Sequence, residues 1–361
     1  MTTTIGTGYG ILPTLIANAS SVHQQLDTLT EQASTGLVSQ TYAGLGNGAS
    51  VSLDLNPQLN ALQTAQSNIG QATGSMGVTQ TAMTQIQQIA ATFAGDIPNL
   101  NGLNPSEIDS VAAQANAALQ QVADLLNTRD GSSYVFGGQD SANPPVPSSA
   151  NILSSGFYTQ INTAVSALST SGASTTAAAT LAIASSNAAG TSPFSAYMSQ
   201  PPNAISPPIV QTGEGGTART GLLASGNSVA VSGGTSTTGS YMRDLMRALA
   251  TLGSMSSSQV NGPGFAALVQ DTGTSLTGVV SAMAVDTGIL GNTQAALTAT
   301  QTRLSDTATA LTAQLSSVQN VDMAQTLSNL TSMQTQLQAS YRLISGDTSL
   351  SLVNFLPASA G

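Results

Sequence analysis

Apolar residues in the first third of the chain recur at the spacing of a helix face. Between residues 12 and 33 they alternate steps of three and four, the 3.5-residue repeat of a coiled coil, and Gly36 then supplies a helix stop. Residues 62–93 repeat the pattern. A third helix is predicted from Pro105, because Asn104 can cap it and Glu107 stands where a capping box places its carboxylate.

The last third of the chain shows the same repeat. It follows shorter helical patterns over residues 242–252 and 265–285, shifts phase at residues 320–322, and resumes until Ile344. Asp322, with Gln325 three residues on, is expected to cap the restarted helix. The seam is the strip of these helices that packs against a partner helix. Its predicted residues are Leu12, Leu15, Val22, Leu26, Leu29, Leu304, Leu311, Leu315, Val318, Leu327, Leu330, Leu337, Tyr341 and Ile344.

The middle of the chain lacks this periodicity. Asp130-Gly131 favours a turn and a short strand follows at Tyr134, which together predict a β-hairpin over residues 126–138. Residues 141–213 contain no charged side chain and hold three Pro-Pro pairs. This stretch is expected to form a small irregular or β-containing module.

A narrow apolar seam needs a partner helix, and the two sets of seams flank the aperiodic middle. The sequence therefore predicts a mainly α fold, an elongated antiparallel helical bundle or coiled coil formed by both chain ends. The first helix is expected to contact Leu330, Leu337, Tyr341 and Ile344 of the last helix, and the sequence does not fix the register of this contact. Three parts are predicted: an N-terminal helical half (residues 1–140), a variable surface-exposed module (141–240) and a C-terminal helical half (241–361).

Charge is scarce on these helices. Only 6% of the residues are charged, against about 25% in typical domains, and the net charge is −10. The stretch from Leu55 to Gly95 has no ionisable residue. A neutral polar face can be buried at lower cost than a charged one, which favours lateral packing of identical subunits, although a composition bias of the organism would look the same. Six scattered arginines and no lysine argue against a nucleic-acid partner.

The residues that could act in catalysis or bind a metal or a phosphate do not form a recognisable site pattern in the sequence. The absence of cysteine excludes disulfides, zinc fingers and iron–sulfur clusters. His23, Asp27 and Glu31 fit a solvated helix face, and the glycines at 6–10 and 44–48 lack the spacing of a phosphate loop. No catalytic, cofactor-binding or metal-binding residue is therefore predicted, and an enzyme is not expected. The apolar runs are too short for membrane insertion, and the N-terminus does not resemble a cleaved signal peptide.

Several segments resemble the bacterial flagellin family, which comprises filament flagellins and the related hook–filament junction protein. Residues 32–36 (QASTG) resemble the family's "STG" helix stop, and residues 286–294 (DTGILGNTQ) resemble the start of its last long helix. Three segments resemble its C-terminal signatures, namely residues 320–324 (NVDMA), 337–341 (LQASY) and 350–356 (LSLVNFL). The resemblance covers roughly residues 5–140 and 240–356, and it depends on the order and spacing of these motifs.

One segment resembles the junction protein more than the filament flagellins. Residues 126–138 (LNTRDGSSYVFGG) are similar to its "LANTRDG-x-YLFAG" segment. The chain departs from the family pattern after Gly36, where Leu37 replaces a basic residue, and at residues 44–48, where the family has an acidic pair. These departures bear on the subunit contacts that this loop makes in the family.

The resemblance implies a structural role rather than a chemical one. Such a protein would be exported without cleavage through the flagellar type III channel, with a chaperone at its C-terminal region. It would then assemble in the extracellular flagellum with itself and with other axial proteins, namely hook-associated proteins and flagellin. The predicted function is a subunit that links hook to filament. A filament flagellin is the first alternative, and a soluble helical adaptor with no flagellar role is the second.

Overall fold

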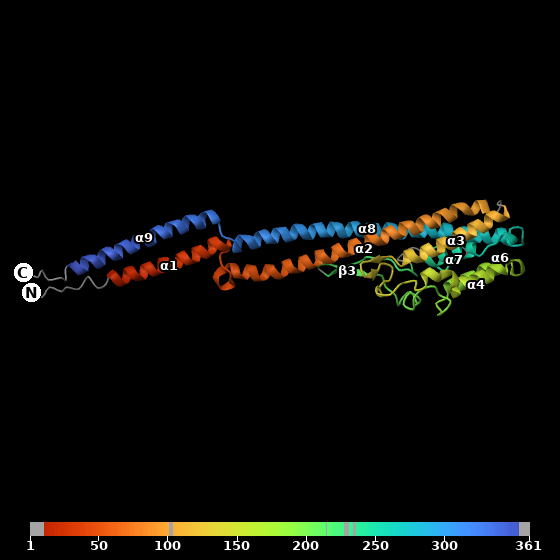
Figure 1. Ribbon diagram of the computed structural model, residues 1–361, viewed down its shortest axis with the longest axis horizontal. Helices are drawn as coiled ribbons and strands as arrows, with labels where there is room; N and C mark the ends of the chain where they lie inside the picture. The colour runs from red at the N-terminus through yellow and green to blue at the C-terminus, as the bar shows by residue number, and fades with distance from the viewer. Residues whose placement is uncertain (1–10, 101–103, 214, 227–230, 234–235, 354–361) are drawn as a thin grey trace, which may run out of the picture. The chain divides into compact units, whose positions relative to one another are not determined.

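The computed structural model describes residues 11–100, 104–213, 215–226, 231–233 and 236–353 (Figure 1). The mainly α prediction is confirmed. The long helices are α1 (Ile11–Thr35), α2 (Gly48–Leu100), α3 (Pro105–Leu126), α8 (Phe265–Gln319) and α9 (Met323–Val353). Shorter helices are α4 (Gly156–Ser166), α5 (Leu168–Ser171), α6 (Ala173–Ser185) and α7 (Tyr241–Gly253), with 3-10 turns at Tyr42–Leu45, Ser149–Ser154 and Ser257–Gln259.

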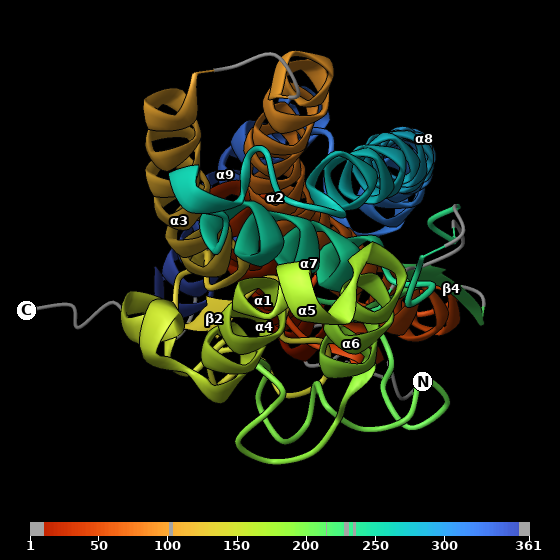
Figure 2. The same ribbon diagram turned by 90° about the vertical axis from the view of Figure 1, so that its right-hand side faces the viewer.

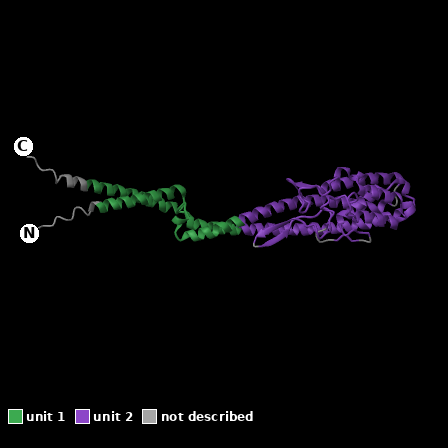
Figure 3. Cartoon of the chain, turned by 90° about the horizontal axis from the view of Figure 1, so that it is seen from below, with its two compact units in different colours: residues 1–61, 306–361 green, residues 62–305 purple. Residues whose placement is uncertain are grey.

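The chain divides into two compact units (Figure 3). The terminal unit comprises residues 1–61 and 306–361, and the central unit comprises residues 62–305. Helices α2 and α8 contribute residues to both units. Within the terminal unit α1 packs against α9, and within the central unit α3 and α6 pack against α7.

In the central unit, glutamine side chains of α8 reach glycine positions of α2, and Gln294 Nε2 donates to the Thr73 carbonyl at 3.3 Å. A Cβ atom on Gly70 would lie 3.4 Å from the side-chain nitrogen of Gln301, and one on Gly77 would lie 3.9 Å from that of Gln294. Both members of the second pair are seven residues from those of the first, in opposite directions along the chain. The two helices are therefore antiparallel in a fixed register that repeats every two turns. The uncharged faces noted in the sequence thus include positions that pack helix against helix.

The β-strands among the described residues form two short antiparallel hairpins. The first pairs β1 (Arg129–Asp130) with β2 (Ser133–Tyr134), and Gly131 occupies the turn at φ +58°. It lies within the segment where the sequence predicts a hairpin. The second pairs β3 (Ile209–Gly213) with β4 (Gly216–Arg219). The predicted capping box is also present, because the Asn104 backbone N–H donates to Glu107 Oε2 at 2.9 Å.

The middle of the chain is more helical than its composition suggests. Helices α4, α5 and α6 lie within residues 156–185, and α4 buries Phe157, Ile161 and Val165 in the common core. The few large side chains of this stretch thus point inward. A segment of low aromatic content folds here because it packs against α7, which supplies the rest of the apolar contact.

Helix α7 is buried along its whole length (Figure 2). In this view it lies between the α2, α3 and α8 side and the α4, α5 and α6 side of the central unit. Its apolar residues Met242, Leu245, Met246 and Leu249 join the core formed with the long helices. The polar face of α7 is therefore covered by the middle of the chain rather than by water.

Two arginines and an aspartate on that polar face form hydrogen bonds with residues 141–240, which we call the middle segment. Arg243, 8% exposed, donates to the Ala184 carbonyl at 3.0 Å and to Asn187 Oδ1 at 2.7 Å. Arg247, 3% exposed, donates to the Ser236 carbonyl at 2.6 Å. Burial lowers the pKa of both guanidinium groups from the ordinary arginine value.

Asp244 completes this buried set with bonds to the loop that precedes α7. It is fully buried and accepts hydrogen bonds from Thr237 Oγ1 at 2.6 Å and from the Thr238 backbone N–H at 2.8 Å. Asp271 of α8 forms an ion pair with Arg247 at 3.7 Å. The middle segment is therefore an integral part of the central unit, because it supplies hydrogen-bond partners to the buried Arg243, Asp244 and Arg247.

We predict that Arg243→Ala destabilises the central unit by about 3 kcal/mol, because it leaves several buried carbonyl groups without a donor. Urea unfolding followed by circular dichroism measures this change. Arg219→Ala is the matched control, because Arg219 is exposed and its loss is expected to cost no more than about 0.5 kcal/mol. Equal unfolding midpoints for the two variants would contradict the assignment of Arg243.

Candidate assembly interface

The two ends of the chain meet in the antiparallel contact between α1 and α9 (Figure 1). Side chains that are buried or half-buried on α1 recur at steps of four and three residues, and so do those on α9. Such alternation is the mark of two helices packed along a common seam. The α1 positions are Leu15, Ala19, Val22, Leu26, Leu29 and Ala33, and the α9 positions are Thr326, Leu330, Met333, Leu337, Ser340 and Ile344.

A short β-bridge joins the end of α1 to the start of α9. Leu37 pairs antiparallel with Asn320. The Val38 N–H donates to the Gln319 carbonyl at 2.7 Å, and the Val321 N–H donates to the Gly36 carbonyl at 3.0 Å. We call this bridge, residues 36–38 with residues 319–321, the joint.

Local sequence features set the geometry of the joint. Gly36 adopts φ +73°, a left-handed conformation that favours glycine and ends α1. Asp322 caps α9, because its Oδ1 accepts the N–H groups of Ala324 at 2.9 Å and Gln325 at 3.1 Å. The Gln325 side chain donates to Asn329 rather than back toward the cap, so the cap uses Asp322 alone. Both helix ends are thus fixed at the same level of the pair.

The predicted seam residues fall into three groups by exposure. Val22 is buried at 9% exposure, and Leu327 and Tyr341 are 50% and 55% exposed. The half-buried residues are Leu15, Leu26, Leu29, Leu304, Leu311, Leu315, Val318, Leu330, Leu337 and Ile344. Leu304 belongs to the central unit, where it packs at the edge of the core. The side chain of Leu12 lies outside the described residues.

The contact face of α9 includes residues that are not in the predicted seam. Thr326, Met333 and Ser340 alternate with the predicted Leu330 and Leu337. Two of these additional residues are polar, so an apolar pattern alone does not single them out. Met333 is apolar, but a repeat through Leu330 and Met333 has the same period as the predicted repeat through Leu327 and Leu330, so the pattern allowed either strip.

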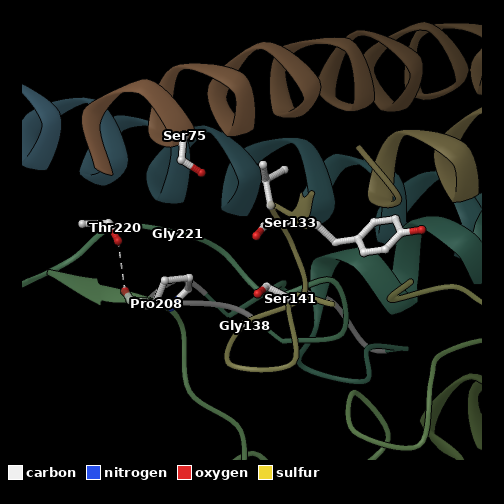
Figure 4. Close-up of a pocket in the computed structure, with 9 residues that line it drawn as sticks. Ser75, Ser133, Gly138, Ser141, Pro208, Thr220 and Gly221 are labelled. Carbon is white, nitrogen blue, oxygen red and sulfur yellow. Dashed lines mark hydrogen bonds between the residues drawn. The ribbon is translucent and has the colours of Figure 1, made fainter. Parts of the chain in front are cut away.

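A small pocket in the central unit offers hydroxyl groups but no charged side chain (Figure 4). Its volume is about 220 Å³, and it lies between α2, the first hairpin and the segment after β4. Its lining residues are Ser75, Ser133, Tyr134, Val135, Gly138, Ser141, Pro208, Thr220 and Gly221. This lining contains no histidine or carboxylate that could act as a general base toward the hydroxyls.

Titratable residues likewise form no cluster of metal-binding type in the part of the chain that the structure describes. His23 lies 4.0 Å from Asp27 one turn along α1, and both side chains are more than half exposed. Tyr241 is buried, and desolvation together with nearby Asp286 raises its pKa well above the ordinary value. These groups serve packing or face solvent, and the α1–α9 contact is the feature that suggests a function.

Helix α8 is long and apolar enough to cross a membrane by length and composition. Its most apolar stretch is 44% buried within the protein. Leu276, Val279 and Met283 of this helix contribute to the core of the central unit. Its hydropathy is therefore explained in part by internal packing.

Comparison with known families places both chain ends in one group. Residues 13–140 match the bacterial flagellin N-terminal helical region, and residues 274–356 match the bacterial flagellin C-terminal helical region. The matches take in α1, α2, α3 and the first hairpin at one end, and most of α8 and α9 at the other. No curated protein matches the chain at a significant level.

We predict that Leu337→Asp weakens the α1–α9 contact, because it places an unpaired carboxylate on the half-buried face of α9. The expected cost is about 1–3 kcal/mol, measured as faster hydrogen exchange of the α1 amides. In cells, motility should fail while secretion of the protein persists.

Gln338→Asp is the matched control, because it adds the same charge one residue away on the exposed side of α9. Its α1 amides should exchange as slowly as those of the wild type. Unchanged exchange and normal swimming with Leu337→Asp would show that residue 337 does not contribute to the contact.

Proposed function

Because the chain belongs to the bacterial flagellin family, we propose that it is the structural subunit that links the flagellar hook to the filament. Family membership itself makes the chain a structural subunit of the extracellular bacterial flagellum that polymerises with its own kind. It also argues against the alternative of a soluble helical adaptor without a flagellar role. The linking role is the finer step of the proposal.

The first hairpin is the observation that supports the linking role. Residues 126–138 resemble the corresponding segment of the junction protein more than that of filament flagellins. The segment is well organised locally, since Arg129 donates to the Ser132 carbonyl at 3.0 Å and lies 5.0 Å over the ring of Tyr134. The residues by which this segment resembles the junction protein thus include ones that shape the hairpin, which supports a shared local structure.

A filament flagellin remains the second candidate. The observation in its favour is the long uncharged stretch from Leu55 to Gly95 on α2, which suits dense packing among many identical copies. A linking subunit packs in the same way but in few copies, so this feature fits both roles. The two candidates therefore differ in abundance and in the neighbours that the subunit contacts.

The proposal includes the route to the flagellum. We infer export through the flagellar type III channel without cleavage, and an export chaperone that binds the C-terminal region. The absence of cysteine fits passage of an unfolded chain, which cross-links would hinder. A chaperone would shield the apolar side of α9 until α1 and other subunits cover it, because exposed apolar surface promotes premature association.

We predict that deletion of the gene leaves hooks without filaments and releases flagellin monomers into the medium. A linking subunit is needed to attach the filament, whereas loss of the filament protein itself would leave no flagellin to release. Electron microscopy of the cells and mass spectrometry of the medium measure the two outcomes, with a strain complemented by the wild-type gene as control.

Copy number gives the independent measurement. Quantitative mass spectrometry of purified flagella should find this protein in far fewer copies than the main filament subunit. A copy number equal to that of the main filament subunit would identify the chain as a filament flagellin. Absence of the protein from purified flagella would overturn both candidates.

A further inference from the structure

Methionine is the only sulfur-containing residue of the chain, which has 10 methionines and no cysteine. The methionines of the central unit are shielded from solvent. Met76, Met83, Met242, Met246 and Met283 are fully buried, and Met198 and Met255 are 1% and 5% exposed. The terminal unit differs, because α9 carries Met323 at 40% exposure and the half-buried Met333. Among the described residues, the methionines that solvent reaches therefore lie on one helix.

Exposure decides which methionine an oxidant attacks. In the reaction with hydrogen peroxide, the methionine sulfur attacks one peroxide oxygen. An S–O bond forms as the O–O bond breaks, the sulfur is oxidised by two electrons to the sulfoxide, and the second oxygen leaves as water. A buried sulfur is reached only when the structure around it opens. Met323 and Met333 are therefore the described methionines that peroxide attacks first in the folded protein.

Met333 lies on the face of α9 that packs against α1. It follows Leu330 by three residues and precedes Leu337 by four, and all three side chains are half-buried. The α1 positions of this contact from Leu15 to Leu29 are apolar, so their side chains offer no hydrogen-bond donor to a sulfoxide oxygen. Conversion of an apolar side chain into a polar one at residue 333 therefore weakens the packing of α9 on α1.

Met323 is the first residue of α9 and lies outside this face. The neighbouring Asp322 caps the helix through the backbone N–H groups of Ala324 and Gln325. Because these bonds involve no atom of the Met323 side chain, oxidation of Met323 leaves the cap in place. Met323 is thus an accessible methionine on the same helix whose oxidation is not expected to affect the contact with α1.

We propose that Met333 is an oxidation site, and that its conversion to the sulfoxide by a peroxide loosens the α1–α9 contact. Methionine sulfoxide reductases reverse this modification, so the effect is reversible. Oxidation acts on the terminal unit and spares the central unit, whose methionines are buried. The proposal does not depend on the linking role, because it concerns the chemistry of the subunit itself.

The test treats the full-length purified protein with hydrogen peroxide at neutral pH and locates each sulfoxide by mass spectrometry of peptic fragments. Hydrogen exchange of the α1 amides is measured before and after treatment, and again after reduction by methionine sulfoxide reductases. Met333→Leu removes the oxidisable sulfur and keeps a helix-forming apolar side chain of similar size. Met323→Leu is the matched control, because it makes the same change at the accessible methionine outside the contact.

Met323 and Met333 should be oxidised before any methionine of the central unit. After oxidation, the α1 amides of the wild type and of Met323→Leu should exchange at least about fivefold faster than in the untreated proteins. Those of Met333→Leu should exchange at the same rate before and after treatment. Reduction should restore the slow exchange of the wild type.

Oxidation of the buried Met76 or Met242 as fast as Met333 would overturn the proposal. So would unchanged α1 exchange in protein fully oxidised at residue 333, or an equal acceleration in Met333→Leu. Unprotected α1 amides in the untreated wild type would also overturn it, because no contact would then be present to loosen. The deletion strain and the copy number report on the linking role alone, so failure of either proposal can be recognised separately.

Discussion

The contact between α1 and α9 is the constraint on which the terminal unit depends. An amphipathic helix with a narrow apolar strip cannot bury that strip by itself, and here each helix finds its partner at the opposite end of the chain. The joint fixes the pairing, because the bridge between Leu37 and Asn320 brings the end of α1 beside the start of α9. Order in one chain end is thus linked to order in the other, which suits a subunit whose ends are completed during assembly.

In the central unit, helix α7 is buried in a different way. Helix α7 is enclosed on all sides, and its charged residues are compensated by backbone carbonyls and hydroxyls of the middle segment. Arg243 and Arg247 are separated by one helical turn and reach groups that lie far apart in sequence. Removal of a single arginine therefore affects several loops at once, which makes α7 the element that ties the middle segment to the long helices.

Helix α1 covers one side of α9. The half-buried residues of α9 lie on that side, and Met323, Leu327 and Tyr341 are 40%, 50% and 55% exposed. The neutral faces of α2 and α8 lie toward each other within one chain, since glutamine side chains of α8 reach the positions of Gly70 and Gly77. Polar residues without charge can serve either within the subunit or between subunits, because their desolvation is inexpensive once they are hydrogen-bonded.

The sequence by itself determined the features that depend on neighbouring residues. The three–four repeats specified the helices, and the caps at Asn104 and Asp322 form as their local pattern indicates. Gly131 likewise supplies the turn of the first hairpin, because only short-range backbone geometry is involved. The family signatures also lie in these periodic ends, so the structural role followed from the same residues.

Tertiary structure decided which strip of α9 faces its partner and how the middle segment folds. Leu330, Leu337 and Ile344 belong to two heptad series, one through Leu327 and one through Met333, and periodicity cannot choose between them because both have the same period. The partners of Arg243 and Arg247 are mostly backbone carbonyls. Any residue type supplies a carbonyl, so no side-chain pattern in the sequence predicts these partners. Contacts of that kind exist only once the chain has brought distant segments together.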